Sequence, residues 1–261
     1  MAFSQFPYMN LNVTTGDGIV AVMVYERDQD VNGWSRFVTR TGDAIESCQV
    51  IPGDGDDEVW MVVKRSINGS DVRYVERVDV GVDTFATDYR YLDCFTTYSG
   101  ASTSTLTGLD HLEGESVRVL GDGVLLGDYT VASGSIDLGD NSVADAVVGF
   151  KIHTEFKPMK FDIDNVSGNS QGQQKSIRKV EVILKDSLGP DLYDDQGKLV
   201  PFKWRDVSDA TDTPIPLFTG VKEASIDGRS SEDPFFTLVN EDPYPMTVTS
   251  VVTRYEITET I

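Results

Sequence analysis

The residues of this sequence that could do chemistry are mainly carboxylates. The densest acidic run is Asp54-Gly55-Asp56-Asp57-Glu58, whose composition suggests calcium binding. An EF-hand loop spaces its ligands over about twelve residues and ends on a glutamate, and this run is too short for that register. We therefore interpret it as a solvated hairpin turn rather than a metal site. We interpret a further set of acids in the same way, as turn residues: Asp28, Asp30, Asp137, Asp140, Asp191, Asp194 and Asp195.

Histidine and cysteine are scarce. The two histidines are His111 and His153, and the two cysteines are Cys48 and Cys94, which is too few for a zinc cluster once the cysteines fall in different units. A serine hydrolase would need one of these histidines beside a positioned serine. The Gly-x-Ser-x-Gly match at Gly168–Gly172 lies in a polar segment that is followed by a predicted strand, so we expect no nucleophile elbow. Cys48 lies in a predicted strand, facing the core with Val50, so we expect free buried thiols. We expect His111 to cap or pack a helical turn. The sequence therefore indicates no catalytic, cofactor-binding or metal-ligating residue.

Two kinds of carbohydrate chemistry stay open. Paired carboxylates for glycoside cleavage depend on spacing in three dimensions, and 43 acidic residues offer many accidental pairs. Trp34, Trp60 and Trp204 could stack on sugars, although we interpret them as core or subunit-interface aromatics. Neither a Walker loop nor Gly-x-Gly-x-x-Gly is present, so nucleotide hydrolysis has no support.

Composition excludes some classes of partner. The chain has 261 residues, 39% of them hydrophobic, and 43 acidic against 22 basic residues give a formal net charge of −21. Phosphate contacts need clustered Lys and Arg, so we expect no nucleic-acid-binding surface. The acidity serves either solubility or the repulsion of polyanions. The N-terminus lacks a basic region followed by an apolar run, and no apolar run approaches a membrane span, so we expect a soluble protein made in the cytoplasm.

Short alternating segments separated by turn residues predict an all-β chain. Ile19–Tyr25 is a nearly continuous apolar run with the length of a buried strand. Four further strands are predicted at a spacing typical of an antiparallel meander: Trp34–Thr39, Ala44–Ile51, Glu58–Lys64 and Val72–Val78. A propeller blade consists of four such strands.

The segment from Leu106 to Gly149 predicts a compact β unit introduced by one helical turn at Asp110–Glu113. Its hairpin has apolar residues at a period of two, on both sides of the turn Gly121-Asp122-Gly123. These apolar residues are Val117, Val119, Val124 and Leu126.

In the third region, Lys175–Leu184 could form a basic amphipathic helix. The alternation of Val180, Val182 and Leu184 with Glu181, Ile183 and Lys185 favours a strand instead. Asp191–Asp212 is loop-rich, and Phe235–Val239 and Met246–Thr258 close the region as strands. We predict three domains: a propeller-blade-like β meander over residues 1–92, a small β-hairpin domain over 93–158, and a C-terminal β domain over 159–261, the last two resembling barrels or sandwiches.

Several of these segments together resemble a known family. Gly108-Leu109-Asp110-His111-Leu112-Glu113-Gly114 is followed by Val-x-Val-Leu-x-Asp-Gly from Val117. The other matching segments are Trp34-Ser35-Arg36, Val59–Arg65, Arg73-Tyr74-Val75-Glu76-Arg77, Lys175–Lys185 and Asp242–Met246. This combination resembles the C-terminal portion of the tail nozzle proteins (tail tubular protein B type) of short-tailed bacteriophages. Nearly the whole chain is covered, by motifs that are structural rather than catalytic. Family members usually carry a long β-propeller-like region first, so the chain is expected to be a fragment or a naturally short relative.

The resemblance implies a structural virion protein of the tail, assembled in the host cytoplasm, and not an enzyme. It implies a homo-oligomeric ring, six-fold in the family, that contacts a tail adaptor ring and tail fibres and encloses a channel for genomic DNA passing without specific binding. It implies no cofactor. We expect the channel to be lined by turn acids, chiefly Asp191, Asp194, Asp195, Asp206, Asp209 and Asp212. The alternatives are a carbohydrate-binding or polysaccharide-depolymerising tail protein and an accessory β module of unrelated origin.

Overall fold

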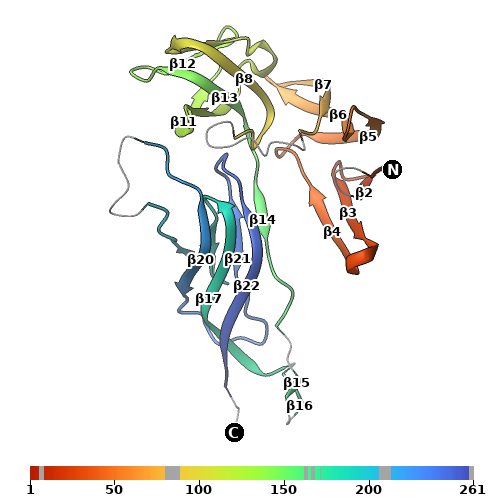
Figure 1. Ribbon diagram of the computed structural model, residues 1–261, viewed down its shortest axis with the longest axis vertical. Helices are drawn as coiled ribbons and strands as arrows, with labels where there is room; N and C mark the ends of the chain where they lie inside the picture. The colour runs from red at the N-terminus through yellow and green to blue at the C-terminus, as the bar shows by residue number, and fades with distance from the viewer. Residues whose placement is uncertain are drawn as a thin grey trace. The chain divides into compact units, whose positions relative to one another are not determined.

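The computed structural model describes residues 1–5, 9–79, 89–161, 164–165, 168–170, 172–205 and 213–258. The regular structure of this part is β-strand apart from two 3-10 turns, η1 (Arg27–Gln29) and η2 (Asp110–Leu112), so the protein is all-β as the sequence predicts (Figure 1). No helix within the described ranges is long and apolar enough to span a membrane. The chain divides into two compact units, Met1–Lys151 and Ile152–Ile261, which are described separately.

The first sheet is a four-stranded antiparallel meander in the order β1-β2-β3-β4. Its strands are β1 (Ala2–Ser4), β2 (Asn10–Thr14), β3 (Val20–Glu26) and β4 (Val31–Phe37). The prediction of a buried strand over Ile19–Tyr25 is wrong for most of β3, in which Val20 is buried and Tyr25 is exposed. The reason is that one face of β3 packs on the core through Val20 and Val22, while the opposite face points to solvent.

The second sheet contains β5 (Ala44–Pro52), β6 (Asp57–Ile67) and β7 (Ser70–Arg77) in sequential antiparallel order. The predicted meander is thus divided between two sheets, since β4 and β5 belong to different ones. Alternate residues of β6 are buried, and its Met61 and Val63 pack with Ile45 and Cys48. The prediction that Cys48 is a free, buried thiol is confirmed.

The third sheet has the order β11-β10-β13-β8. The same stretch of chain also forms a two-stranded sheet, β12-β9. The strands are β8 (Leu92–Thr103), β9 (Thr105–Thr107), β10 (Ser116–Gly121), β11 (Val124–Thr130), β12 (Ser135–Asp137) and β13 (Val143–Lys151). The predicted hairpin is β10–β11. Asp122 and Gly123 both have positive φ, 48° and 78°, as a two-residue type I′ turn requires, which confirms the predicted turn. The predicted helical turn is η2.

The core of this part of the chain crosses the predicted domain boundary at residue 92. Leu109, Leu112 and Val119 form it with Phe150, and Ile67 at the end of β6 belongs to the same cluster. Val72 and Tyr74 of β7 pack against it. The first two predicted domains therefore lie in one compact unit, which ends at Lys151 rather than at residue 158.

The second unit contains two sheets that share a core. The three-stranded sheet has the order β20-β17-β22, formed by β17 (Gln174–Ser187), β20 (Phe218–Ser225) and β22 (Thr247–Thr258). The four-stranded sheet has the order β14-β21-β18-β19, formed by β14 (Thr154–Phe156), β18 (Asp191–Tyr193), β19 (Leu199–Val200) and β21 (Thr237–Asn240). A short pair, β15 (Asp164–Asn165) and β16 (Gly168–Asn169), completes the unit.

The core of the second unit lies between these two sheets. Val180, Val182 and Leu184 of β17 are fully buried, so Lys175–Leu184 is a strand, as predicted. They pack with Leu192 of β18 and Leu238 of β21. The result is an open sandwich, and none of the described sheets closes into a barrel.

Candidate functional site

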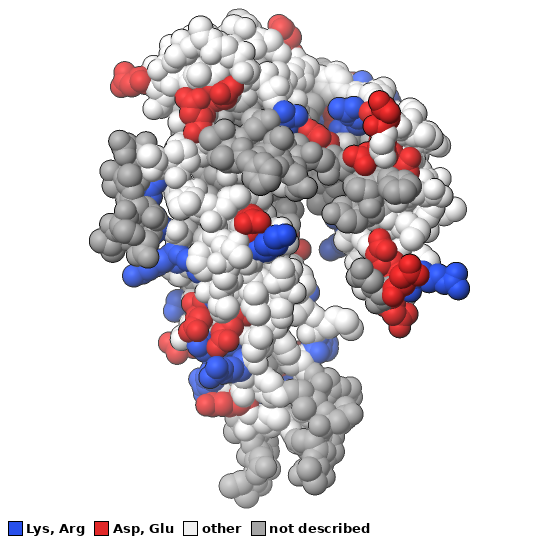
Figure 2. All heavy atoms as spheres, in the orientation of Figure 1, with Lys and Arg blue, Asp and Glu red and all other residues white. Residues whose placement is uncertain are grey.

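The acidic residues that the sequence singles out are dispersed. Asp54 and Asp56 are exposed in the turn between β5 and β6. Within the described ranges, no group of three or more His, Cys, Asp or Glu side chains is arranged to hold a metal ion. On the face seen in Figure 2, acidic and basic side chains occur next to one another in several places. The net negative charge is therefore not gathered there into one continuous acidic surface.

The expectation that turn acids project from the third region is wrong for Asp194. Its side chain is buried, and its Oδ1 accepts hydrogen bonds from the backbone N–H groups of Gln196 and Lys198 at 3.0 and 2.8 Å, which stabilises the turn before β19. Asp191 is half-buried within β18, where burial and the neighbouring Asp242 raise its pKa. Asp206, Asp209 and Asp212 lie outside the described residues.

The two histidines belong to different units. His111 lies in η2, where its carbonyl accepts a hydrogen bond from the Tyr74 hydroxyl at 2.8 Å and its ring meets that of Tyr74 edge-on. His111 thus packs a helical turn, as predicted. His153 is exposed, with its Nδ1 3.0 Å from Oε1 of Glu241 and its Nε2 3.6 Å from Oε2 of Glu155. In the part of the chain that the structure describes, these histidines and cysteines belong to no metal-binding group of three or more side chains.

Neither cysteine is placed as a nucleophile. Cys48 Sγ accepts a hydrogen bond from the Thr14 hydroxyl at 3.2 Å. Cys94 is half-buried, and burial, together with the Glu76 carboxylate, raises the pKa of its thiol to about 12. A thiol with that pKa stays protonated at neutral pH and is a poor nucleophile.

The strongest polar cluster of the first unit, which the sequence analysis did not identify, surrounds Arg65 of β6. Arg65 is fully buried. Its guanidinium donates to both carboxylate oxygens of Glu76, at 2.6 and 2.5 Å, and to both oxygens of Asp93, at 2.9 and 2.7 Å. Asp43, whose side chain is also fully buried, accepts from Nη1 at 3.0 Å. We call Arg65 and these three carboxylates the Arg65 cluster.

A second arginine extends the cluster. Arg40 bonds to Glu115 at 2.5 Å and to the carbonyl of Ser66 at 2.6 Å, and its guanidinium lies 4.1 Å from the centroid of the Phe150 ring. It also contacts Asp43, so the two arginines share a carboxylate. The groups joined come from β6, β7, β8 and the loops around Asp43 and Glu115. The cluster therefore ties together segments from the first two predicted domains.

The electrostatics of the cluster are those of a structural clamp. Burial disfavours the charged guanidinium of Arg65, but the hydrogen bonds and charges of Glu76 and Asp93 outweigh it and raise the pKa above the ordinary value. The arginine stays charged, and its donors are directed at three carboxylates. A sequence signal exists, because Arg65 continues the buried row Val59, Met61, Val63, and a charged residue in such a row needs buried partners.

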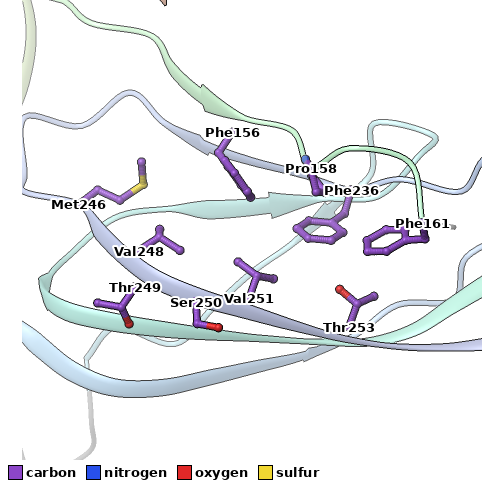
Figure 3. Close-up of a pocket in the computed structure, with 10 residues that line it drawn as sticks. All are labelled: Phe156, Pro158, Phe161, Phe236, Met246, Val248, Thr249, Ser250, Val251 and Thr253. Atoms are coloured by element: carbon purple, nitrogen blue, oxygen red, sulfur yellow. The ribbon is translucent and has the colours of Figure 1, made fainter. Parts of the chain in front are cut away.

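The second unit has an open apolar groove between β14 and β22, with a cavity volume of about 510 Å³. The rings of Phe161 and Phe236 stack with centroids 6.3 Å apart, and Figure 3 shows them with Phe156 in the space between the two strands. The side chains that line the groove are Phe156, Pro158, Phe161, Phe236, Met246, Val248, Thr249, Ser250, Val251 and Thr253, none of which is charged.

The groove is bounded by the edges of two sheets. β14 and β22 are each the terminal strand of their sheet, and in the described part of the chain neither has a strand on its outer side. Thr249 is an extra residue in the register of β22 with β17, which makes a β-bulge at one end of the groove. From Ser250 to Arg254 the register is regular. Unpaired N–H and C=O groups of such an edge are a template for another strand.

The fold and these two features define an all-β protein of open antiparallel sheets, with a buried ionic clamp in one unit and an apolar groove in the other. No model of a known protein family matches the chain. A comparison with curated protein sequences also finds no match.

Proposed function

We propose that this protein is a structural virion protein, a ring subunit of the nozzle at the distal end of a short phage tail. The proposal begins from the sequence resemblance. The observation that carries it is that residues of three matching segments, Val59–Arg65, Arg73–Arg77 and Gly108–Gly114, make structural contacts with one another. A pattern of this kind supports a mechanical role better than a catalytic one.

The segment from Gly108 to Gly114 illustrates this. Leu109 and Leu112 are fully buried in the core. The Glu113 carboxylate accepts hydrogen bonds from the backbone N–H groups of Gly134 and Ser133, at 2.7 and 2.9 Å, which lower its pKa. Leu109, Leu112 and Glu113 thus hold this loop in place.

A second matching segment, Arg73-Tyr74-Val75-Glu76, meets the first. The Tyr74 hydroxyl donates to the carbonyl of His111, and Glu76 is a partner of Arg65. Two parts of the sequence pattern that lie far apart along the chain are thus joined directly. A subunit that must keep its shape while a genome is held under pressure and then released gains from such cross-connections.

The charge of the chain is compatible with a DNA channel. Each Lys or Arg contact with a phosphate adds affinity through counterion release and would slow a passing duplex. A chain with 43 acidic and 22 basic residues offers little of this. The proposed mechanism is that a ring of copies retains the genome until receptor engagement opens a constriction, while acidic walls keep the DNA from binding. The adaptor ring and tail fibres would be its partners in the particle.

Electron microscopy of particles carrying this chain tests the proposal. We expect a closed ring of copies at the tail tip. A single copy off the tail axis, or tight binding of the purified chain to duplex DNA at physiological salt, would contradict it. Release of sugar from host polysaccharide by the purified chain would instead support a depolymerising tail protein.

A further inference from the structure

Strand β4 is an unusually open edge of the first sheet. It ends the order β1-β2-β3-β4, and six of its seven residues are exposed. Its register with β3 runs without a bulge from Val31 to Phe37. Proteins normally protect such edges with bulges, prolines or inward charges, because an unprotected edge recruits another strand. Trp34, in the middle of β4, is 60% exposed.

Trp34 also ends an apolar row across this sheet. Phe3 lies opposite Leu11, Leu11 opposite Met23, and Met23 opposite Trp34. Directly opposed residues point to the same face of a sheet, so these four side chains form one row. The row lies on the face away from the core, because Val20 and Val22 of β3 point to the other side. Phe3 and Trp34 are exposed, and Leu11 and Met23 are half-buried. A partly exposed apolar row that ends at an open edge indicates a contact surface.

The groove between β14 and β22 has the complementary features. Its volume of about 510 Å³ falls within the range of about 300–1,000 Å³ found for pockets that hold small organic groups. An indole ring would fit such a space. The edge of β22 beside the groove, from Ser250 to Arg254, can form hydrogen bonds with another strand. This favours a strand of a protein over a small apolar molecule as the occupant of the groove.

Charge permits these two surfaces to meet. A net charge of −21 makes copies of this chain repel one another in general. The only charged residue of β4 is Arg36, which is basic, and no charged residue lines the groove. A contact between β4 and the groove therefore brings no acidic side chains of these two surfaces together.

We propose that β4 of one copy of this chain docks against β22 of a second copy, with Trp34 inserted in the apolar groove. The two surfaces are different, so the contact is head-to-tail, and repetition of a head-to-tail contact closes into a ring when the rotation between copies allows it. This inference rests on the proposed function in one respect, since it names the contact that a ring of copies would need.

Two variants, each disabling one surface, test the contact by sedimentation velocity over a range of concentrations. Trp34→Asp removes the inserted side chain, and Ser250→Glu places a charge in the groove; both positions are exposed, so folding should be kept. Each variant alone should associate roughly 30-fold more weakly or worse, as expected for the loss of a central aromatic anchor. An equal mixture should form a heterodimer, because Trp34→Asp keeps the groove and Ser250→Glu keeps β4.

Val75→Asp on β7, which removes a 69% exposed apolar side chain elsewhere, is the control and should associate like the parent. The proposal is overturned if the parent stays monomeric up to its solubility limit, if either variant associates like the parent, or if the mixture stays monomeric. A ring at the tail tip together with normally associating variants would reject this contact and leave the nozzle function standing. If the variants show the head-to-tail contact but the protein is not found in phage tails, the contact stands and the nozzle function is rejected.

Discussion

Arg65 and Glu76 form a two-point ion pair in which Nε and Nη2 of the arginine lie 2.6 and 2.5 Å from the two carboxylate oxygens. Arg65 has no exposed surface, whereas the Glu76 side chain retains 21% of its exposure. Because the guanidinium cannot reach water, its positive charge is stabilised by the carboxylates of Glu76, Asp93 and Asp43 instead. Its removal would leave three carboxylates without their shared cation.

Arg65→Met should therefore destabilise the first unit by about 3–5 kcal/mol, the usual cost of breaking a buried ion pair from one side. Arg65→Lys should also be destabilising, because an ammonium group cannot donate to two carboxylates in the fork geometry of a guanidinium. Urea unfolding monitored by circular dichroism measures both. The control is Arg73→Met, which breaks the exposed pair of Arg73 and Glu46 and should cost far less, because water screens an exposed ion pair. Equal effects of the Arg65→Met and Arg73→Met changes would mean that the Arg65 cluster has no special role.

The turn between β10 and β11 gives a second prediction. Gly123 has a φ of 78°, which a β-branched residue adopts only with strain, so Gly123→Val should cost on the order of 1–3 kcal/mol and lower the melting temperature. Calorimetry measures the change. Gly16→Val is a suitable comparison, because Gly16 lies in a turn without a positive φ and has open space around it. An unchanged melting temperature in Gly123→Val would show that the turn tolerates a side chain.

Asp191 gives a prediction about pH. Burial and the neighbouring Asp242 raise its pKa in the folded protein, so its ionised form is disfavoured by folding. A group with a raised folded pKa contributes stability that is present below the unfolded pKa and lost as pH rises through the folded pKa. Asp191→Asn should thus be more stable than the parent at neutral pH, with the difference disappearing in acid. Urea unfolding across the pH range measures it.

Glu113 should behave in the opposite way and serves as the comparison for Asp191. The backbone N–H groups of Gly134 and Ser133 lower its pKa, so the stability that it contributes is present above the unfolded pKa and lost as pH falls through the folded pKa. Glu113→Gln should be less stable than the parent at neutral pH, and the two should converge in acid. The same sign for the Asp191 and Glu113 variants at neutral pH would contradict the environments described for these carboxyls.

The thiols give a prediction about reactivity. Cys48 is buried, and burial raises the pKa of Cys94 to about 12, so both should react slowly with a thiol reagent at pH values near neutrality. Addition of denaturant should make both react rapidly. The reaction is followed with an aromatic disulfide reagent, by the absorbance of the thiolate that it releases. The Cys48→Ala variant reports on Cys94 alone. Rapid labelling of Cys94 in the folded Cys48→Ala variant would show that this thiol is accessible to the reagent and that its pKa is not raised.

Local pattern was sufficient to predict much of the fold. The alternation of Val180, Val182 and Leu184 with Glu181, Ile183 and Lys185 identified β17 as a strand, because side chains of a strand point alternately to its two faces. Asp122-Gly123 identified the hairpin turn, because few residues adopt positive φ without strain. Cys48 was placed in the core for the same reason of alternation. These conclusions depend only on residues that are close in the sequence, because strand alternation and backbone φ are set locally.

Tertiary structure alone decided what joins to what. Asp43, Glu76 and Asp93 are far apart in the sequence and meet at Arg65 only because the sheets pack together, which removes the boundary expected near residue 92. The apolar groove likewise exists only because β14 and β22 end their respective sheets side by side. Burial of a charge and the open edge of a sheet depend on which distant segments come to cover them, and a one-dimensional pattern does not contain that information.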